Sequence, residues 1–220
     1  MSPIYDISIP LNDKTLVYPG DPPFVRERTS DLEQGAPFNF SHISCGLHTG
    51  THLDMPAHFI REGDTALDID ISRWILPALV VNTGEAREIT AELIASILME
   101  PGDALLFQTR NSKRGLLRGT TVPDDYTALT PEAARLCVEL KCSLVGIDWL
   151  TVDLAGDQEY GAHRSLLGAR IPILECIDLS GVPVGRYTLV ALPLPLEGAE
   201  ASLSRAILLS PASLALNHHS

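Results

Sequence analysis

The sequence has few cysteines, and none of them forms a recognisable pair. The chain contains 4 cysteines in 220 residues, and no Cys-x-x-Cys motif occurs among them. This excludes a zinc knuckle and a thioredoxin-type redox motif. Cys137 and Cys142 lie in apolar segments, where a free cysteine behaves as a small hydrophobic residue. Isolated cysteines are typical of a reducing compartment, so we expect a cytoplasmic protein.

The chain also lacks a long hydrophobic run and an excess of positive charge. No apolar stretch reaches the ~18 residues that a membrane span needs. Residues 1–13 have neither the basic region nor the apolar core of a signal peptide. The 28 acidic and 16 basic residues give a net charge of −12. We therefore expect no nucleic-acid partner and no membrane-binding polybasic patch.

Hydrophobic residues make up 45% of the chain. A chain of 220 residues with this composition can bury a sizeable core, so we expect one domain over residues 1–220. Short apolar or alternating runs predict strands, and two segments with apolar residues at helical spacing predict helices. The expected strands span residues 3–10, 75–81, 104–108, 144–148, 171–177, 187–194 and 205–209, and the expected helices span residues 90–98 and 130–141.

These elements predict a strand-rich α/β fold with few helices. No glycine-rich turn leads from an early strand into a helix, so a doubly wound nucleotide-binding sheet is not expected. The polar segments 24–36 and 109–125 are expected to be loops. Residues 38–44 begin with alternating side chains and are expected to pair, as a hairpin, with the histidine-rich segment that follows. The pattern leaves the order of the strands in the sheet open.

The histidine-rich segment 48–58, HTGTHLDMPAH, is the strongest functional signal. Side chains of an extended strand alternate between its two sides, so His48, His52 and Asp54 would share one side. Imidazole nitrogen and carboxylate oxygen are suitable ligands for a divalent transition metal. His58 follows the strand and is expected to lie near its end. We therefore predict a metal site here.

Two other interpretations of this segment are weaker. A single histidine is more often a structural residue than a ligand, but three within eleven residues are harder to explain in that way. A helix would also align His48 with His52, but Gly50 and Pro56 oppose a helix. By contrast, His42 is interpreted as structural, and the histidines of the tail 217–220 as solvated.

Further candidate ligands lie in the second half of the chain. Glu175 falls inside an apolar strand, where a carboxylate is costly to bury unless it is paired or binds a metal. The alternative is a strand edge that turns this side chain to solvent. His163 is the only histidine between His58 and the tail. Asp148 and Asp153 are candidates either as ligands or as acceptors for a histidine N–H.

The segment HTGTHLDMPAH resembles the HxGTHxDxPxH motif of the cyclase-like metal-dependent hydrolase family, whose best-known branch is the bacterial kynurenine formamidases, or arylformamidases. The similarity extends over nearly the whole chain. It includes Tyr5-Asp-Ile-Ser8, Tyr18-Pro-Gly-Asp21, Gly146-Ile-Asp148, His163 followed by Leu166-Leu167, and Ile173-Leu-Glu175.

The resemblance implies a swivelling β/β/α domain with two divalent metal ions, usually Zn²⁺ and sometimes Mn²⁺. It also implies a homodimer or homotetramer in which neighbouring subunits help to close the pocket. His58 would be the catalytic acid/base. One metal would be held by His48, His52 and Asp54, and Asp54 would bridge to a second metal held also by His163 and Glu175.

The activity implied is hydrolysis of N-formyl-L-kynurenine to L-kynurenine and formate, through a metal-activated water, in tryptophan breakdown. The substrate would be a small aromatic amide. Thr151, Ala162 and Cys176 stand where the formamidase branch often has other residues, which leaves the substrate open. A cyclic amide such as isatin, or a lactone, is the alternative substrate, and a non-catalytic metal- or ligand-binding protein is the alternative class.

Aromatic side chains could line the substrate pocket. The candidates are Phe24, Phe59, Trp74 and Trp149. Core packing is the alternative role for each of them.

Overall fold

The main sheet is built from strands distributed over the whole chain. The computed structural model describes residues 4–211. Within them the strands of this sheet are β1 (Ile4–Asp6), β4 (His52–Asp54), β5 (Ile75–Asn82), β7 (Ala104–Gln108), β9 (Leu144–Ile147), β10 (Ile173–Glu175), β11 (Gly185–Pro193) and β12 (Ala201–Leu209).

This sheet closes on itself. Its strand order is β1-β12-β11-β5-β7-β9-β10-β4, and β4 also pairs with β12. The neighbours β5, β7, β9 and β10 run parallel, whereas β4 is antiparallel to both β10 and β12. The result is a barrel-like sheet in an α/β fold, as predicted. The closure places β4 between two partners and leaves it without a free edge.

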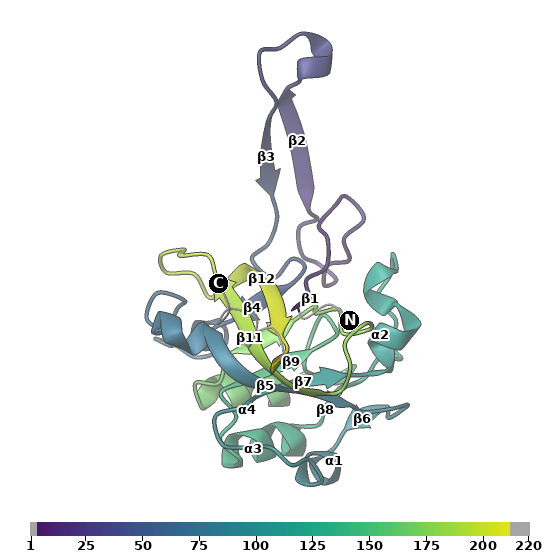
Figure 1. Cartoon of the computed structure of the whole chain (residues 1–220), viewed down its shortest axis with the longest axis vertical. Coiled ribbons are helices and arrows are strands. Elements are labelled where there is room, and N and C mark those ends of the chain that lie inside the picture. Colours follow the sequence, from purple (N-terminus) through teal and green to yellow (C-terminus); the bar gives the residue numbers. More distant parts are fainter. Residues whose placement is uncertain (1–3, 212–220) are drawn as a thin grey trace.

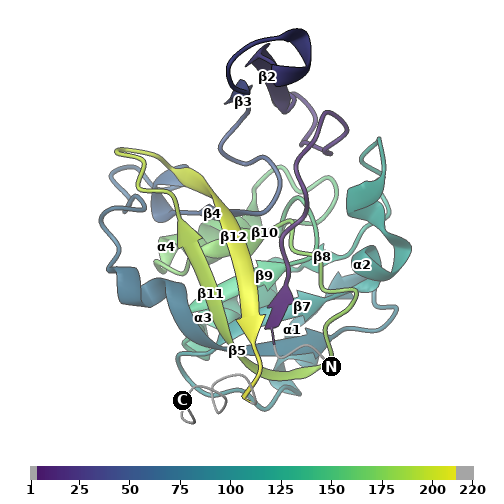
Figure 2. The ribbon, with the colours of Figure 1, turned by 45° about the horizontal axis from the view of Figure 1, so that its top comes forward.

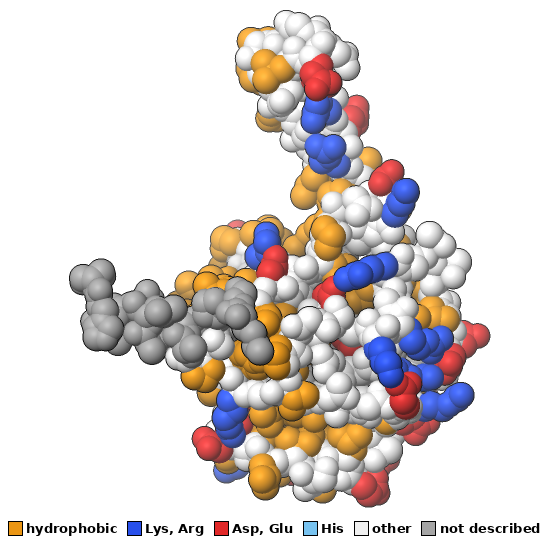
Figure 3. Space-filling model, turned by 45° about the vertical axis from the view of Figure 1, so that its right-hand side comes forward, with side chains coloured by type: hydrophobic (Ala, Val, Ile, Leu, Met, Phe, Trp, Pro, Cys, Tyr) orange, Lys and Arg blue, Asp and Glu red, His pale blue; other side chains and the backbone are white. Residues whose placement is uncertain are grey.

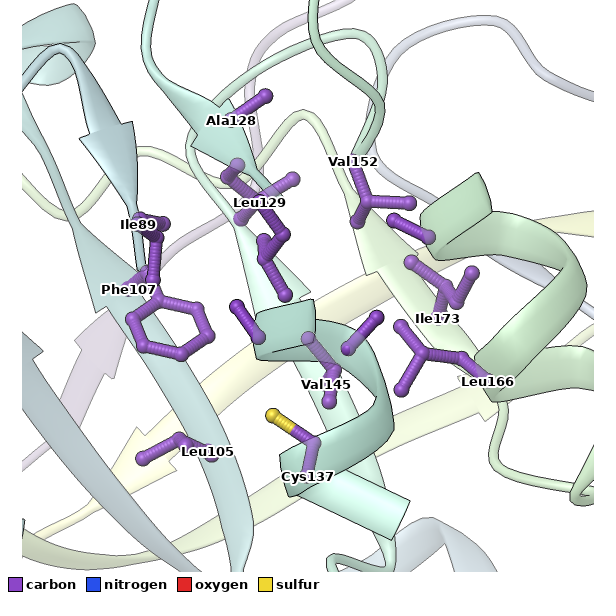
Figure 4. Packing of buried hydrophobic residues seen from close by; sticks show 14 of the residues in the cluster. Ile89, Leu105, Phe107, Ala128, Leu129, Cys137, Val145, Val152, Leu166 and Ile173 are labelled. Atoms are coloured by element: carbon purple, nitrogen blue, oxygen red, sulfur yellow. The ribbon is translucent and has the colours of Figure 1, made fainter. Parts of the chain in front are cut away.

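One hydrophobic core fills the inside of the barrel, and a second lies between its outer face and the helices. Successive strand residues face opposite sides. In β7, Leu106 belongs to the inner core, and Leu105 and Phe107 belong to the outer one. Figure 4 shows the outer core, where Phe107 and Val145 of the sheet belong to the same cluster as Cys137 and Leu166 of the covering helices. Cys137 is fully buried, as predicted.

Four α-helices surround the sheet in the described part of the chain: α1 (Ala91–Ala95), α2 (Arg110–Arg114), α3 (Pro131–Glu139) and α4 (Gly161–Gly168). Three of these helices have a threonine N-cap. The Oγ1 atoms of Thr90, Thr109 and Thr130 accept hydrogen bonds from backbone N–H groups in the first turns of α1, α2 and α3. Figure 2 shows α3 and α4 together on one face of the sheet. The remaining strands β6 (Glu88–Ile89) and β8 (Ala128–Leu129) pair with each other.

A two-stranded arm projects from the barrel. Its strands are β2 (Val25–Ser30) and β3 (Phe40–Ser44), joined through a 3₁₀ turn at Leu32–Gln34 (Figure 1). The predicted loop over residues 24–36 is therefore wrong, and so is the expected pairing of residues 38–44 with the histidine-rich segment. Both faces of the arm are exposed, so its sequence carries no clear apolar face from which a strand could be read.

Three other predictions need correction. The strand predicted through residues 48–54 begins only at His52, because Gly50 has a positive φ of 67°. Residues 109–125 contain α2 and a 3₁₀ turn at Leu116–Arg118 where a loop was expected. Helix α4 was not predicted. The tail histidines fall outside the described residues. Within residues 4–211, no helix has the length and apolar character that crossing a membrane requires.

Candidate metal centre

Strand β4 places two candidate ligands on the outer face of the barrel. Leu53 points inward and belongs to the inner core, so His52 and Asp54 on either side of it face outward. Across the ladder, His52 is paired with Glu175 of β10, which brings an imidazole and a carboxylate to the same face. Glu175 is only 3% exposed. This excludes the solvent-facing alternative for that side chain.

His48 reaches the same place from a turn that precedes β4. Gly50 allows this turn, because its φ of 67° is one that other residues rarely adopt. A Cβ atom on Gly50 would also lie 2.3 Å from the Cδ2 atom of Leu11. The chain therefore bends back at Gly50, and Nδ1 of His48 lies 2.8 Å from Oδ1 of Asp54.

The five candidate ligands lie close together, with the histidines around the carboxylates of Asp54 and Glu175. Nε2 of His52 lies 3.4 Å from Oδ1 of Asp54 and 3.5 Å from Oε2 of Glu175. Nε2 of His163, on α4, lies 3.4 Å from Oδ2 of Asp54 and 3.4 Å from Oε1 of Glu175. Donor atoms of His52, Asp54 and Glu175 all lie within 4.8 Å of one another, as do those of His48, Asp54 and His58.

The donor atoms fit a cation. Among the described residues, Nε2 of His52 and both carboxylate oxygens of Asp54 are buried without a hydrogen-bond partner. His48 comes close to Asp54, but the approach does not have the geometry of a hydrogen bond. Buried polar atoms without partners are costly. Bound divalent metal would satisfy these atoms, since both atom types are common metal ligands.

Neighbouring groups orient two of the imidazoles. Nδ1 of His52 donates to the backbone oxygen of Gly50 at 2.7 Å. Nδ1 of His163 donates to Oδ2 of Asp153. In each ring this leaves the lone pair of Nε2 directed at the carboxylates, which is the arrangement that a metal ligand needs. The second oxygen of Asp153 accepts from the backbone N–H of Ala162 at 2.8 Å and so caps α4.

Asp148 does not reach this centre. Its carboxylate accepts hydrogen bonds from the backbone N–H and Oγ1 of Thr109 and from the backbone N–H of Ser112. It therefore caps α2. His42 also lies elsewhere, on the arm, with its Nε2 3.4 Å from Glu27.

The electrostatics of the centre favour a bound positive charge. Burial lowers the pKa of His52, but Asp54 and Glu175 outweigh it and hold this pKa well above its usual value. Burial likewise raises the pKa of Asp54, but His52, His163 and His48 outweigh it and hold the pKa well below its usual value. His58 differs, because burial lowers its pKa. An imidazole of that kind is neutral at physiological pH and can accept a proton.

A pocket of about 290 Å³ opens beside the centre. Its lining includes His48, His58, His163 and Glu175, together with the aromatic side chains of Tyr18, Phe59, Tyr126 and Tyr160. Of the four aromatic residues considered from sequence, only Phe59 lines this pocket. Phe24, Trp74 and Trp149 are buried in the fold. The tyrosines were missed, although Tyr18 lies in one of the segments that resemble the family.

Phe59 links the ligands to the pocket. Its ring stacks on His163 with centroids 4.9 Å apart and an interplanar angle of 27°. It meets His58 edge-on at 4.6 Å and lies 5.3 Å from the ring of Tyr160. A planar aromatic substrate would therefore find aromatic faces immediately beside the candidate metal ligands.

A sequence profile of the "Putative cyclase" family matches residues 5–154. The chain belongs to this family. The kynurenine formamidase of Bacillus cereus is 34% identical over 203 residues, which cover 92% of this chain and 95% of that protein. The kynurenine formamidase of Bacillus cytotoxicus is 35% identical over the same shares of the two chains. The predicted family is thus confirmed.

Solved structures of similar proteins have the same fold. A structure described as a potential metal-dependent hydrolase with cyclase activity superposes with a TM-score of 0.79 at 31% identity, covering 93% of this chain and 96% of that one. Isatin hydrolase A from Labrenzia aggregata, bound to benzyl benzoate, superposes with a TM-score of 0.82 at 25% identity, covering 94% and 93%. The predicted strand-rich α/β fold is confirmed by these likenesses.

Proposed function

We propose that the protein is a metal-dependent amidohydrolase that converts N-formyl-L-kynurenine to L-kynurenine and formate. The observation that carries this proposal is the set of unpartnered donor atoms on His52 and Asp54, facing Glu175 and His163 beside an aromatic pocket. The similarity to kynurenine formamidases over 92% of the chain supports the choice of substrate.

Two groups of side chains would hold two divalent ions. His48, His52 and Asp54 are assigned to the first ion, and Asp54, His163 and Glu175 to the second. A carboxylate can bridge two ions because it offers two oxygens, and the two oxygens of Asp54 face different histidines. By family likeness the ions are Zn²⁺, with Mn²⁺ as the alternative. When bound, such ions lower the pKa of water and polarise a carbonyl group.

His58 is assigned as the acid/base. Its ring lies 4.2 Å from the ring of His48 and 5.8 Å from that of His163, and this closeness to two assigned metal ligands supports the assignment. Because burial lowers its pKa, the neutral ring can take a proton from the attacking water. It can then deliver that proton to the leaving nitrogen of the amide. Phe59, edge-on to His58, restricts the orientation of the ring.

Hydrolysis of a cyclic amide is the second candidate activity. The likeness to isatin hydrolase A, with a TM-score of 0.82, favours it. The same donor atoms and the same proton transfer would open a ring amide. Thr151, where the formamidase branch often has a serine, lies in the pocket lining. The replacement of serine by threonine at this position therefore affects which amide the pocket can hold.

The test compares the two amides directly. Purified protein is loaded with Zn²⁺ or Mn²⁺ and given N-formyl-L-kynurenine or isatin, with a chelated sample as the control. We expect kynurenine absorbance to rise in the loaded sample only, and at a higher kcat/KM than isatin opening. If isatin is the better substrate, the second activity replaces the first. No turnover of either amide refutes the proposed function.

We also propose that the chain forms a homodimer or homotetramer in a reducing cytoplasm. The arm formed by β2 and β3 supports the oligomer, because an isolated two-stranded hairpin is only marginally stable in water. Phe38, Phe40 and Ile43 are each 58% exposed on it, and Figure 3 shows apolar side chains on the projecting arm. The 4 cysteines are all free thiols, which supports the compartment. Light scattering tests the oligomer.

A further inference from the structure

The proposed substrate has a charged end that the pocket must accommodate. N-formyl-L-kynurenine carries its formamide on an aromatic ring, and a short ketone chain leads from that ring to an α-amino acid group. Among the described residues, the pocket lining contains four carboxylates, namely Asp21, Asp153, Asp157 and Glu175, and no lysine or arginine. The proposed metal ions are assigned to the formamide, so the lining offers the α-carboxylate no cationic side chain, and one from just outside it is the candidate.

Arg164 lies in the required position. Its Cζ atom is 5.5 Å from the centroid of the Phe59 ring, and Phe59 lines the pocket. Phe59 in turn stacks on His163 at 4.9 Å. The guanidinium and a candidate metal ligand thus contact the same aromatic ring, and in the substrate the formamide and the short ketone chain that ends at the amino acid group are carried on adjacent carbons of one ring.

The guanidinium is anchored by one hydrogen bond and one aromatic contact. Nε of Arg164 donates to the backbone oxygen of Glu159 at 3.0 Å. Its Cζ atom also lies over the Phe59 ring, within the range of a cation–π contact. The side chain is exposed, and within residues 4–211 its hydrogen bond comes from Nε and leaves the two terminal nitrogens without a hydrogen bond. A pair of N–H donors is therefore available for bidentate binding of a carboxylate.

We propose that Arg164 binds the α-carboxylate of the substrate, and so makes the site selective for formamides that carry an amino acid group over neutral or purely cationic ones. This inference rests on the proposed function. Isatin has no carboxylate, so the same residue would also favour the linear substrate over the cyclic one. Arg164 would determine specificity and would take no part in the proton transfer.

The test measures two substrates that differ by one group. N-formylkynuramine keeps the ring, the ketone and the amine of N-formyl-L-kynurenine but lacks the carboxylate. Arg164→Met should raise KM for N-formyl-L-kynurenine by about tenfold, the low end for a charge-assisted hydrogen bond because the side chain is exposed. KM for N-formylkynuramine and kcat for both should change little. Arg164→Lys should restore part of the loss.

Arg135→Met is the matched control, because it removes the same charge from α3, where Arg135 pairs with Glu132. It should leave both KM values unchanged. Equal losses for both substrates in Arg164→Met, or no loss, would overturn the inference. Wild-type protein that hydrolyses N-formylkynuramine as well as N-formyl-L-kynurenine would also overturn it, with the hydrolase proposal intact. Wild-type protein that hydrolyses neither would refute the proposed function and the inference with it.

Discussion

Replacing Asp153 with asparagine should weaken metal binding without unfolding the protein. Asp153 accepts the Nδ1 proton of His163 with Oδ2, and its Oδ1 accepts from the backbone N–H groups of Ala162 and His163 at 2.8 and 3.3 Å. Asparagine can keep the Oδ1 contacts and hence the cap of α4. Its amide nitrogen would then face Nδ1 of His163.

Two donors cannot share that contact, so the imidazole must change its tautomer. With the proton moved to Nε2, the lone pair that faces Asp54 and Glu175 is lost. Groups that orient a metal-binding histidine are worth about 10- to 100-fold in metal affinity. This corresponds to about 1.4–2.7 kcal/mol. The stability of the metal-free chain should fall by about 1 kcal/mol, from the lost charge at the helix N-terminus.

The assay is a competition titration with a metal-binding dye, run on wild-type protein, Asp153→Asn and Asp157→Asn. Asp157 is the matched control, since it also caps the start of α4, through the backbone N–H of Gly161 at 2.9 Å. Its carboxylate oxygens accept from the backbone N–H groups of Glu159 and Gly161 and, in the described chain, make no hydrogen bond to His163. Wild-type affinity in Asp153→Asn, or an equal loss in Asp157→Asn, would refute the tautomer argument.

Two further predictions follow from the site and from the barrel. His58→Ala should keep its metal content but lower kcat by about 10²- to 10⁴-fold, as for loss of a general acid/base; a loss of bound metal would instead make His58 a ligand. Gly146→Ala should lower the free energy of unfolding by about 1–3 kcal/mol in urea titrations, because overpacking costs about that much. The new Cβ would lie 2.5 Å from Cδ2 of Leu106 and 3.3 Å from Cδ1 of Ile177. Gly181→Ala, with no atom within 4 Å of the added Cβ, should be unchanged, and equal losses in both glycine variants would contradict the packing argument.

Local chemistry made much of the site predictable from sequence. Imidazoles and a carboxylate at close spacing in residues 48–58 indicated a metal, and a glutamate inside an apolar strand was costly enough to need a partner. The structure brings His163 and Glu175 to Asp54. The strand assignment through His48 failed, because a glycine with positive φ changes the chain direction and alternation no longer applies.

Other features depended on contacts that a single sequence does not display. The pairing of β4 with β12 joins residues about 150 positions apart, and nothing in either strand specifies its partner. Helix α4 begins after Tyr160, which has a positive φ and provides no side-chain cap, so the usual start signal is missing. The arm has the sequence of a loop because its strands are exposed on both faces and carry no apolar face. The sequence does not distinguish Asp153 from Asp148 as the partner of a histidine. The contacts of the structure do, because Asp153 binds His163 and Asp148 binds Thr109.

Elemental analysis of the purified, metal-loaded protein tests the central claim most directly. Two groups of ligands that share Asp54 predict two divalent ions per chain in the wild type. His163→Ala should retain about one ion, and Asp54→Asn should retain none. The readout does not depend on the choice of substrate. A wild-type protein that binds no divalent ion under any loading condition would contradict the account.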